Sequence, residues 1–270
     1  MLTLLQGPES AEYGSWFARV ARELLLERGL WVAGEVHRLL EVEFYYHHSE
    51  GHPDPFTHGE EQQLGCGRWY FHRSGGSYRG GTYKGLDISF GPNDVYGGIL
   101  IRSLRRSDGA VINGSSLCVE HLLTATGKSS VAELDAAIGE RAVDDPASPL
   151  ALLPIEGEGA EVHATARVGL TLKRAGQHPE MVDYILRPYR FLTAPREIDK
   201  GRVQLVMALH QTGMAPEAIA ACCGCARRVV ERQIEDFEAG RAMAVTDFFG
   251  KSLGTRALCR LHGALAGSPD

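Results

Sequence analysis

The chain has 270 residues with a formal net charge of −6, and 44% of its residues are hydrophobic while 23% are charged. This composition is typical of a globular protein and excludes a disordered chain, a collagen-like fibre and a coiled-coil rod. No stretch reaches the ~18 apolar residues of a membrane span, and the first residues lack the features of a secretory signal. Together with six cysteines and no export signal, this predicts a soluble cytoplasmic protein with reduced thiols.

The N-terminal part of the chain begins with a predicted helix. Apolar residues recur at helical spacing over residues 10–28, with Ser10 as the expected N-cap and Gly29 as the end of the helix. Residues 37–46 alternate between apolar and polar side chains, which predicts a strand. A loop rich in Pro, Gly and His follows as far as about Gly67.

The middle of the chain is predicted to be rich in strands. Glycines punctuate residues 69–104 in a pattern typical of antiparallel strands joined by tight turns. Short helices are expected at 113–126 and 130–141, and further strands at 161–173.

From about residue 198 the pattern is helical throughout. Two short helices meet at Gly224, and this arrangement is compatible with a helix-turn-helix. Residues 186–260 carry 12 Lys and Arg against 8 Asp and Glu, whereas the rest of the chain carries 16 against 26. The basic excess indicates either a phosphate-binding surface, with Arg227 and Arg228 as candidate contacts, or chance clustering at solvated positions.

Two carboxylates mark the predicted strand at 37–46. Glu41 and Glu43 lie on one face, followed by Tyr45 on the same face. Buried carboxylates are costly unless they meet a cation or hold a water, and a carboxylate beside an aromatic ring could activate water next to a flat substrate. The alternative is an ordinary solvated strand face.

Two further clusters raise the question of a metal. The loop after the strand contains histidines and a carboxylate, and the predicted helix-turn-helix contains three cysteines. Imidazole, thiolate and carboxylate suit zinc or iron, but neither spacing fits a standard ligand motif, so a metal is the less favoured alternative at both clusters. The residues concerned are His47, His48, His52, Asp54, Cys222, Cys223 and Cys225.

Several short segments together resemble the alkyladenine (3-methyladenine) DNA glycosylases, the type without a helix-hairpin-helix. The first active-site segment of that family has the form E-x-E-A-Y, and a histidine follows about a dozen residues later. In this chain a segment of that kind is followed by six further matching segments in the family's order, over roughly residues 30–195. The matching segments are 41–45 (EVEFY) with His58, 75–78 (GGSY), 87–89 (DIS), 99–103 (ILIRS), 114–117 (GSSL), 167–169 (RVG) and 188–191 (PYRF).

The resemblance implies a mechanism for cleaving an N-glycosidic bond in a base that has left the duplex stack. Glu43 would act as general base on a water aimed at the anomeric carbon, and Arg102 and the Val168 carbonyl would hold that water. Tyr45 would stack on the extruded base, Glu41 would lie beside it, and His58 would form a hydrogen bond to it from the side. This implied mechanism needs no metal and no organic cofactor.

This sequence departs from the family pattern at three places. About four extra residues precede His58, and the glycine hairpin is about three residues shorter. Tyr83 is the nearest candidate for the tyrosine that fills the gap left by the flipped base. Asp87 replaces the family's gating Asn, so it would either accept a hydrogen bond from an exocyclic amine of the base or pair with Lys84 or Arg102.

The sequence therefore predicts an α+β protein with three parts. Residues 1–30 would form an N-terminal helix packed on the core, 31–195 a strand-rich antiparallel glycosylase-like domain, and 196–270 a helical extension that could bind DNA. The expected function is release of a modified, alkylated purine from DNA in base excision repair. The alternatives are a hydrolase of a free nucleoside or nucleotide and a non-catalytic nucleic-acid-binding regulator.

Overall fold

The computed structural model describes residues 5, 12–91, 95–157 and 159–267 and divides the chain into two compact units. The N-terminal unit comprises residues 1–162 and 191–193, and the C-terminal unit comprises residues 163–190 and 194–270. This division differs from the boundary expected near 195, because residues 163–190 group with the C-terminal helices. The N-terminal helix belongs to the same unit as the sheet.

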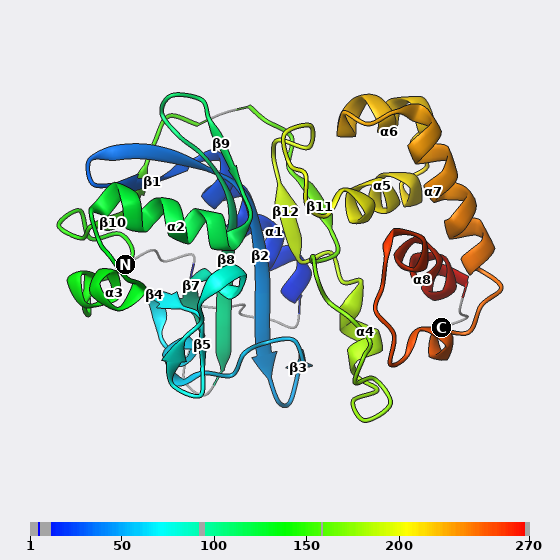
Figure 1. Ribbon diagram of the computed structural model, residues 1–270, viewed down its shortest axis with the longest axis horizontal. Coiled ribbons are helices and arrows are strands. Elements are labelled where there is room, and N and C mark those ends of the chain that lie inside the picture. Colours follow the sequence, from blue (N-terminus) through cyan, green and yellow to red (C-terminus); the bar gives the residue numbers. More distant parts are fainter. Residues whose placement is uncertain (1–4, 6–11, 92–94, 158, 268–270) are drawn as a thin grey trace. The chain divides into compact units, whose positions relative to one another are not determined.

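The N-terminal unit is built on a large, curled antiparallel sheet, so the predicted α+β class is confirmed (Figure 1). Its main path runs in the order β10-β1-β2-β8-β7-β4, and segment 191–193 lies along β2, where the Thr193 amide donates to the Leu40 carbonyl. The strands of this unit are β1 (Arg28–Val32), β2 (Glu35–His48), β3 (His52–Pro53), β4 (Cys66–Phe71), β5 (Arg73–Ser74), β6 (Ser77–Tyr78), β7 (Leu86–Phe90), β8 (Tyr96–Arg105), β9 (Val111–Asn113) and β10 (Leu150–Pro154).

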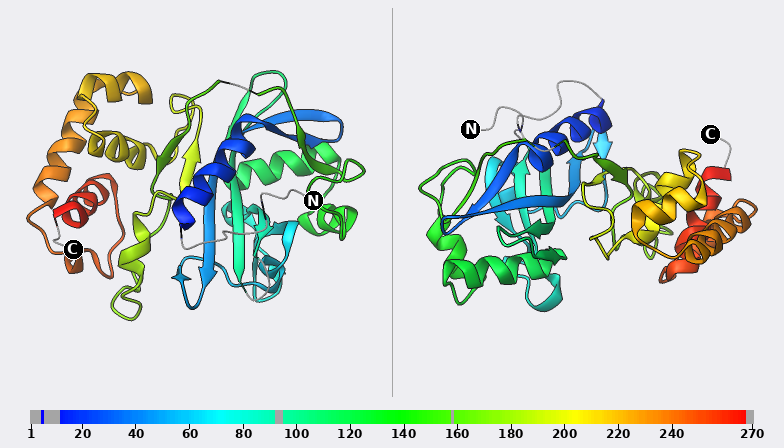
Figure 2. Two further views of the ribbon diagram at one scale, coloured as in Figure 1. Left: turned by 180° about the vertical axis from the view of Figure 1, so that it is seen from behind. Right: turned by 90° about the horizontal axis from the view of Figure 1, so that it is seen from above.

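Helices cover both faces of the sheet (Figure 2). On one side lies α1 (Tyr13–Leu26), and on the other lie α2 (Ser115–Thr126) and α3 (Val131–Ile138). The α1 side is packed with aromatic rings: Phe17 stacks on Phe44 with centroids 4.8 Å apart. Trp16, Tyr46 and Phe90 belong to the same cluster, so aromatic side chains supply much of the core on that side.

The N-terminal helix ends earlier than predicted. It stops at Leu26, and Gly29 instead lies inside β1, where it is paired with Leu153 and a side chain would lie 2.8 Å from Val36. Gly29 is therefore needed for close packing rather than for a helix end. The predicted N-cap, Ser10, lies outside the described residues. Two short 3₁₀ helices, η2 (Glu61–Leu64) and η3 (Gly81–Tyr83), stand in the loops of this unit.

The C-terminal unit is helical, as the sequence predicted. The strands expected over 161–173 were largely wrong: only β11 (His163–Thr165) forms, because Gly169 takes a left-handed φ of 84° that a strand cannot accommodate. The remaining elements are α4 (Met181–Ile185), β12 (Arg190–Leu192, which the unit boundary divides), α5 (Arg202–Gln211), α6 (Pro216–Cys223), α7 (Arg227–Gly240), η4 (Val245–Phe248) and α8 (Thr255–Gly267).

Glycines set the geometry of the C-terminal helices. Gly224 ends α6 in the left-handed conformation, with its amide bonded to the Ala220 carbonyl, as expected for a tight turn. Helices α7 and α8 approach closely because Gly263 has no side chain. A Cβ atom at this position would lie 1.9 Å from the Phe237 carbonyl oxygen. Among the described residues, no helix is long and apolar enough to cross a membrane.

Candidate active site

A buried ion cluster lies where β2 and β8 pair. Glu41 is 1% exposed and Glu43 is fully buried, so the alternative of a solvated strand face is wrong. The Arg102 guanidinium on β8 bridges them: Nε lies 3.2 Å from Oε1 of Glu41 and Nη1 lies 3.3 Å from Oε2 of Glu43. Two buried carboxylates are tolerated here because one cation and several hydrogen bonds compensate their charge.

Two hydroxyls complete this cluster. The Tyr45 phenol donates to Oε2 of Glu43 over 2.8 Å, and the Ser103 hydroxyl donates to Oε2 of Glu41 over 2.6 Å. Burial works against the charge on Arg102, but the two carboxylates outweigh it and raise the pKa of the guanidinium. The site therefore holds a fixed cation between two carboxylates. The Tyr45 hydroxyl is hydrogen-bonded to Glu43, the residue predicted to act as general base.

Strand register brings Asp87 onto the same face as Glu43. In β2, β8, β7 and β4 the residues Glu43, Leu100, Asp87 and Tyr70 are successive cross-strand partners. Directly paired residues of antiparallel strands point to one face, and two strand spacings separate Glu43 from Asp87, roughly 10 Å at the backbone. Glu43, the predicted general base, and Asp87, at the position of the family's Asn, thus lie on the same face of the sheet.

Asp87 has a partner that the sequence did not suggest. Its Oδ1 lies 2.7 Å from Nε2 of His72, and the side chain is 1% exposed. Asp87 pairs with neither of the two cations that the sequence suggested. Lys84 instead pairs with Glu120, and Arg102 pairs with the two glutamates. Its other oxygen lies over Gly98, where a side chain would come within 2.4 Å of Oδ2.

His58 lies beside this pair, and its role in holding a base stays a prediction. Its ring meets the His72 ring edge-on with centroids 4.4 Å apart. Burial, and then the neighbouring His72, lower the pKa of His58 to about 4. His58 is therefore a neutral imidazole at pH 7, with one donor and one acceptor nitrogen.

Tyr83 stands on the surface of the N-terminal unit with 74% of its area exposed. It ends η3, which is fastened to the start of α2 by the Ser116 hydroxyl donating to the Gly81 carbonyl over 2.8 Å. Leu117, the next residue of α2, is also exposed at 54%. An exposed aromatic ring on a short braced loop is suited to insertion between bases.

Three predicted site residues belong to the C-terminal unit. Val168 lies there, whereas Glu43 lies in the N-terminal unit, so its role as a water ligand stays a prediction. Arg227 is paired with Glu217 and Glu231, each over 2.7 Å. Arg228 lines a cavity of about 830 Å³ bordered by α7 and α8.

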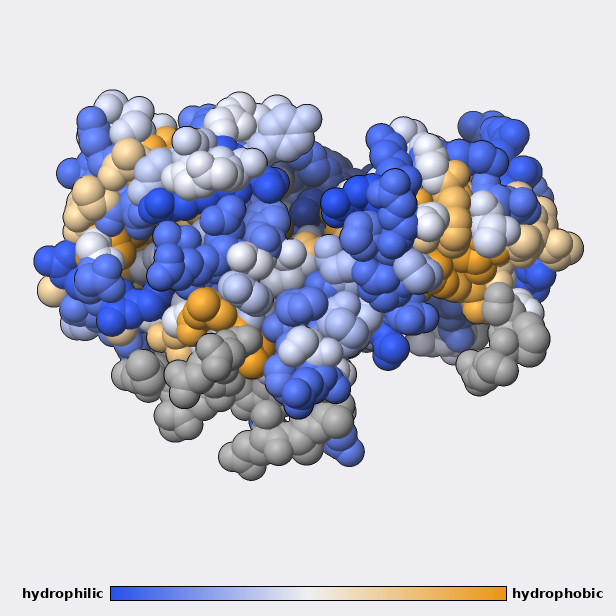
Figure 3. All heavy atoms as spheres, turned by 90° about the horizontal axis from the view of Figure 1, so that it is seen from below, coloured by the Kyte–Doolittle hydropathy of each residue, from blue (hydrophilic) through white to orange (hydrophobic). Residues whose placement is uncertain are grey.

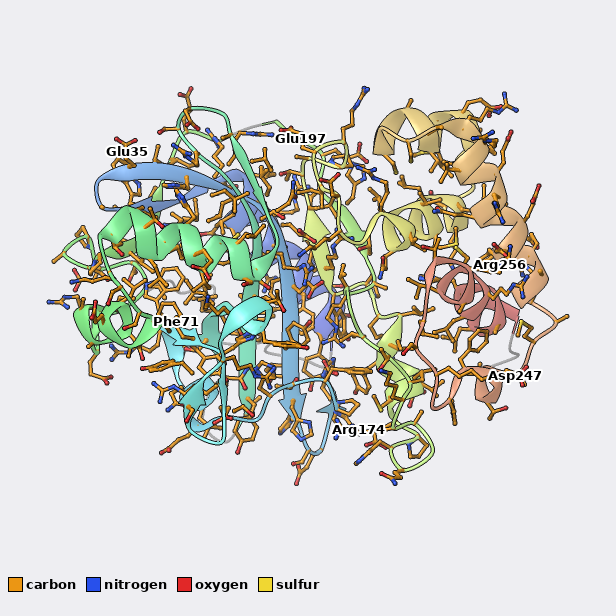
Figure 4. The ribbon with its side chains drawn as sticks, viewed as in Figure 1. Glu35, Phe71, Arg174, Glu197, Asp247 and Arg256 are labelled. Atoms are coloured by element: carbon orange, nitrogen blue, oxygen red, sulfur yellow. The ribbon has the colours of Figure 1, made fainter. Side chains whose placement is uncertain are left out.

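The surface of the C-terminal unit mixes charge with apolar area. Figure 3 shows apolar surface on this unit within a mostly hydrophilic exterior. A second cavity of about 450 Å³ is lined by Met243, Phe248 and Ala257 together with Asp247 and Arg256. Figure 4 shows these last two, Asp247 at η4 and Arg256 at the start of α8.

The two clusters considered for metal binding are occupied by other contacts. His52 bonds the Tyr46 carbonyl through Nδ1 and packs on Tyr13, while an oxygen of Asp54 accepts from the Phe56 amide. Cys222 lies 4.0 Å from Nε2 of His163. In the part of the chain that the structure describes, no group of three or more His, Cys, Asp or Glu side chains is arranged to hold a metal ion.

Comparison with known proteins indicates a relative but no function. No family model matches the chain. The chain is similar to the uncharacterized protein L759 of Acanthamoeba polyphaga mimivirus, at 29% identity over 205 residues that cover 70% of this chain and 91% of the relative.

Proposed function

We propose that the protein is a DNA glycosylase that hydrolyses the N-glycosidic bond of a modified purine flipped out of DNA. The observation that carries the proposal is the buried Glu43 carboxylate, held by the Tyr45 hydroxyl and Arg102 on the same sheet face as Asp87. The order of the matching segments supports it as well. In this proposal the sheet unit is glycosylase-like, and the protein is cytoplasmic and acts on the nucleoid.

In the proposed reaction, Glu43 takes a proton from a water, and the water oxygen bonds to the anomeric carbon. The carbon–nitrogen bond breaks and its electron pair passes to the purine nitrogen, so that a cationic alkylpurine leaves as a neutral molecule. Arg102 acts as a positioning residue, since its guanidinium fixes the Glu43 carboxylate and balances its charge. Glu41 accepts from Arg102 in turn, and the Ser103 hydroxyl donates to Glu41. Tyr45 would present its ring to the base while its hydroxyl orients Glu43. No step requires a metal or an organic cofactor.

Two features favour a purine within DNA as the substrate over a free nucleoside. Tyr83 is an exposed wedge on a braced loop, and an extruded base leaves a gap in the stack that a flat ring can fill. The helices α6 and α7, joined by the tight turn at Gly224, would act as a helix-turn-helix that contacts phosphates.

The test is a glycosylase assay with purified full-length protein on duplexes that carry single modified purines, with base release measured directly. Release from duplex DNA by the wild type, but not by Glu43→Gln, supports the proposal. Hydrolysis of free nucleosides without release from DNA would favour the nucleoside hydrolase. Tight binding to duplex DNA without any release would favour a non-catalytic regulator.

A further inference from the structure

A cavity of about 830 Å³ lies along α7 and the start of α8, within the C-terminal unit. Its volume is in the range of sites that enclose a small molecule, about 300–1,000 Å³. The lining residues lie on α7 from Arg228 to Asp236 and at the start of α8, where Arg256 stands (Figure 4). The proposed reaction uses none of them, so the cavity is a second candidate binding site.

Two arginines of this cavity are without an ion-pair partner among the described residues. Arg228 and Arg232 are four positions apart on α7, which places them on one face with Cβ atoms roughly 5–6 Å apart. Like charges at this spacing destabilise a helix, and an anion bound to both would remove the repulsion. Guanidinium groups match the oxygens of a phosphate, which carries enough charge for two of them.

The carboxylates at the cavity do not neutralise these two arginines. Glu231 pairs with Arg227 over 2.7 Å, and Asp236 pairs with Arg260 over 3.1 Å. Glu235 is exposed, where water and salt screen its charge. Neither α7 nor α8 has an acidic residue in its first turn, although the amides there favour an anion. One side of the cavity therefore remains suited to a phosphate.

A buried amide in the cavity wall points to a second group on the ligand. Gln233 is 9% exposed, and its Oε1 is buried without a hydrogen-bond partner among the described residues. An unpaired buried carbonyl oxygen costs free energy, which an N–H donor of a ligand would recover. A glutamine amide is complementary to the edge of adenine, where an exocyclic amine lies beside a ring nitrogen.

An apolar side chain lies between the phosphate-binding and amide groups. At 3.6 residues per turn, Val229 falls between Arg232 and Gln233 around the axis of α7. Val229 lines the cavity and is 43% exposed. Its surface could cover one face of a purine ring. The cavity thus combines cations, an apolar contact and an amide, in that order around the helix.

We propose that this cavity binds a free adenine nucleotide, with the phosphate on Arg228 and Arg232 and the exocyclic amine on Gln233. The site is separate from the proposed reaction and does not depend on it. The backbone of DNA is the other source of phosphate. The bases of an intact duplex are paired and stacked, however, so they offer no amine to an amide that is nine-tenths buried. A free nucleotide satisfies both ends of the cavity.

The test is a calorimetric titration of the full-length protein with three probes. Adenosine 5′-monophosphate should bind at one site per chain. Purine riboside 5′-monophosphate lacks the exocyclic amine and should bind about tenfold more weakly, because Oε1 of Gln233 stays unpaired. Adenosine lacks the phosphate and should bind about 10- to 100-fold more weakly, the range for hydrogen bonds to charged groups.

Three variants assign the two ends of the site. Arg228→Gln and Arg232→Gln should each weaken binding of adenosine 5′-monophosphate about tenfold. Gln233→Leu should remove the preference for the amine. It should not lower the unfolding midpoint of the free protein, because it also removes an unpaired polar group. Arg241→Gln is the matched control, since Arg241 is a half-exposed arginine of the same unit that pairs with Glu238 over 2.9 Å.

The inference is overturned if adenosine 5′-monophosphate does not bind, or binds no better than adenosine. Wild-type affinity in both arginine variants would also overturn it, as would an unchanged preference for the amine in Gln233→Leu. Displacement of adenosine 5′-monophosphate by an undamaged duplex would show instead that the cavity takes DNA phosphates. None of these titrations measures base release, so their failure leaves the proposed function to its own assay.

Discussion

The hydroxyl of Tyr45 donates a 2.8 Å hydrogen bond to Oε2 of Glu43, the same oxygen that Arg102 approaches to 3.3 Å. Two donors on one oxygen fix the orientation of the carboxylate, which a general base needs before it meets water. Tyr45, which was expected to stack on the extruded nucleobase, thus also orients Glu43, the predicted general base.

Replacement of Glu43 by Gln should abolish turnover and leave substrate binding nearly intact. The amide has the same shape but takes no proton from water, so turnover should fall by about 10²–10⁴-fold. Glu41→Gln is the comparison, since Glu41 contacts Ser103 and Arg102 in the same cluster. The measurement is single-turnover base release with binding to uncleaved duplex. Activity retained in Glu43→Gln and lost in Glu41→Gln would assign the base to Glu41.

Arg102→Met should destabilise the fold strongly. Removing one member of a buried ion cluster leaves charges uncompensated and costs about 3–5 kcal/mol. The control is Arg106→Met, because Arg106 pairs with Asp108 over 2.8 Å at an exposed position, where the loss should be at most about 1 kcal/mol. Denaturant unfolding of the two variants measures both values. Equal stabilities would show that the cluster does not depend on the Arg102 charge.

The protein should lose stability in acid partly through His262. This residue of α8 is 3% exposed, burial lowers its pKa to about 4, and its Nε2 has no hydrogen-bond partner among the described residues. The unfolded chain takes up the proton near pH 6.5, so the contribution is present above that pH and is lost as pH falls towards 4, by up to roughly 3 kcal/mol. His262→Leu should flatten the unfolding free energy between pH 6.5 and 4. An unchanged slope would exclude His262 as its source.

If the C-terminal unit contacts phosphates, Arg228 should matter more than Arg227. Arg227 already pairs with Glu217 and Glu231, whereas Arg228 borders the cavity along α7. Arg228→Gln should therefore weaken duplex binding. It should also make the negative slope of log affinity against log salt concentration shallower by about 1, and Arg227→Gln should have a smaller effect. Salt titrations of binding measure the slope. Unchanged slopes in both variants would leave this unit with a structural role.

The sequence by itself indicated strand β2, the strands within residues 69–104 and the side chains that share one face of β2, but it did not indicate β1 or β10. Alternation placed Glu41, Glu43 and Tyr45 on one face, and glycine spacing indicated the antiparallel strands, because both signals are local and depend on residue type alone. Burial of the carboxylates was not local: the bridge to Arg102 joins positions 61 and 59 residues apart. Sequence order suggested that these segments belong together without showing which atoms meet.

Only the tertiary structure decided the environment of Asp87. The pairing with His72 depends on the register between β4 and β7 and on the absence of side chains at Gly85 and Gly98, none of which a linear pattern encodes. A polar His two residues after the buried Tyr70 was the available signal, since alternate residues of a strand share a face. The unit boundary was decided in the same way, because residues 163–190 gain their packing from helices that follow them in the chain. Local propensity reports what a segment can form, and long-range packing selects where its side chains are buried.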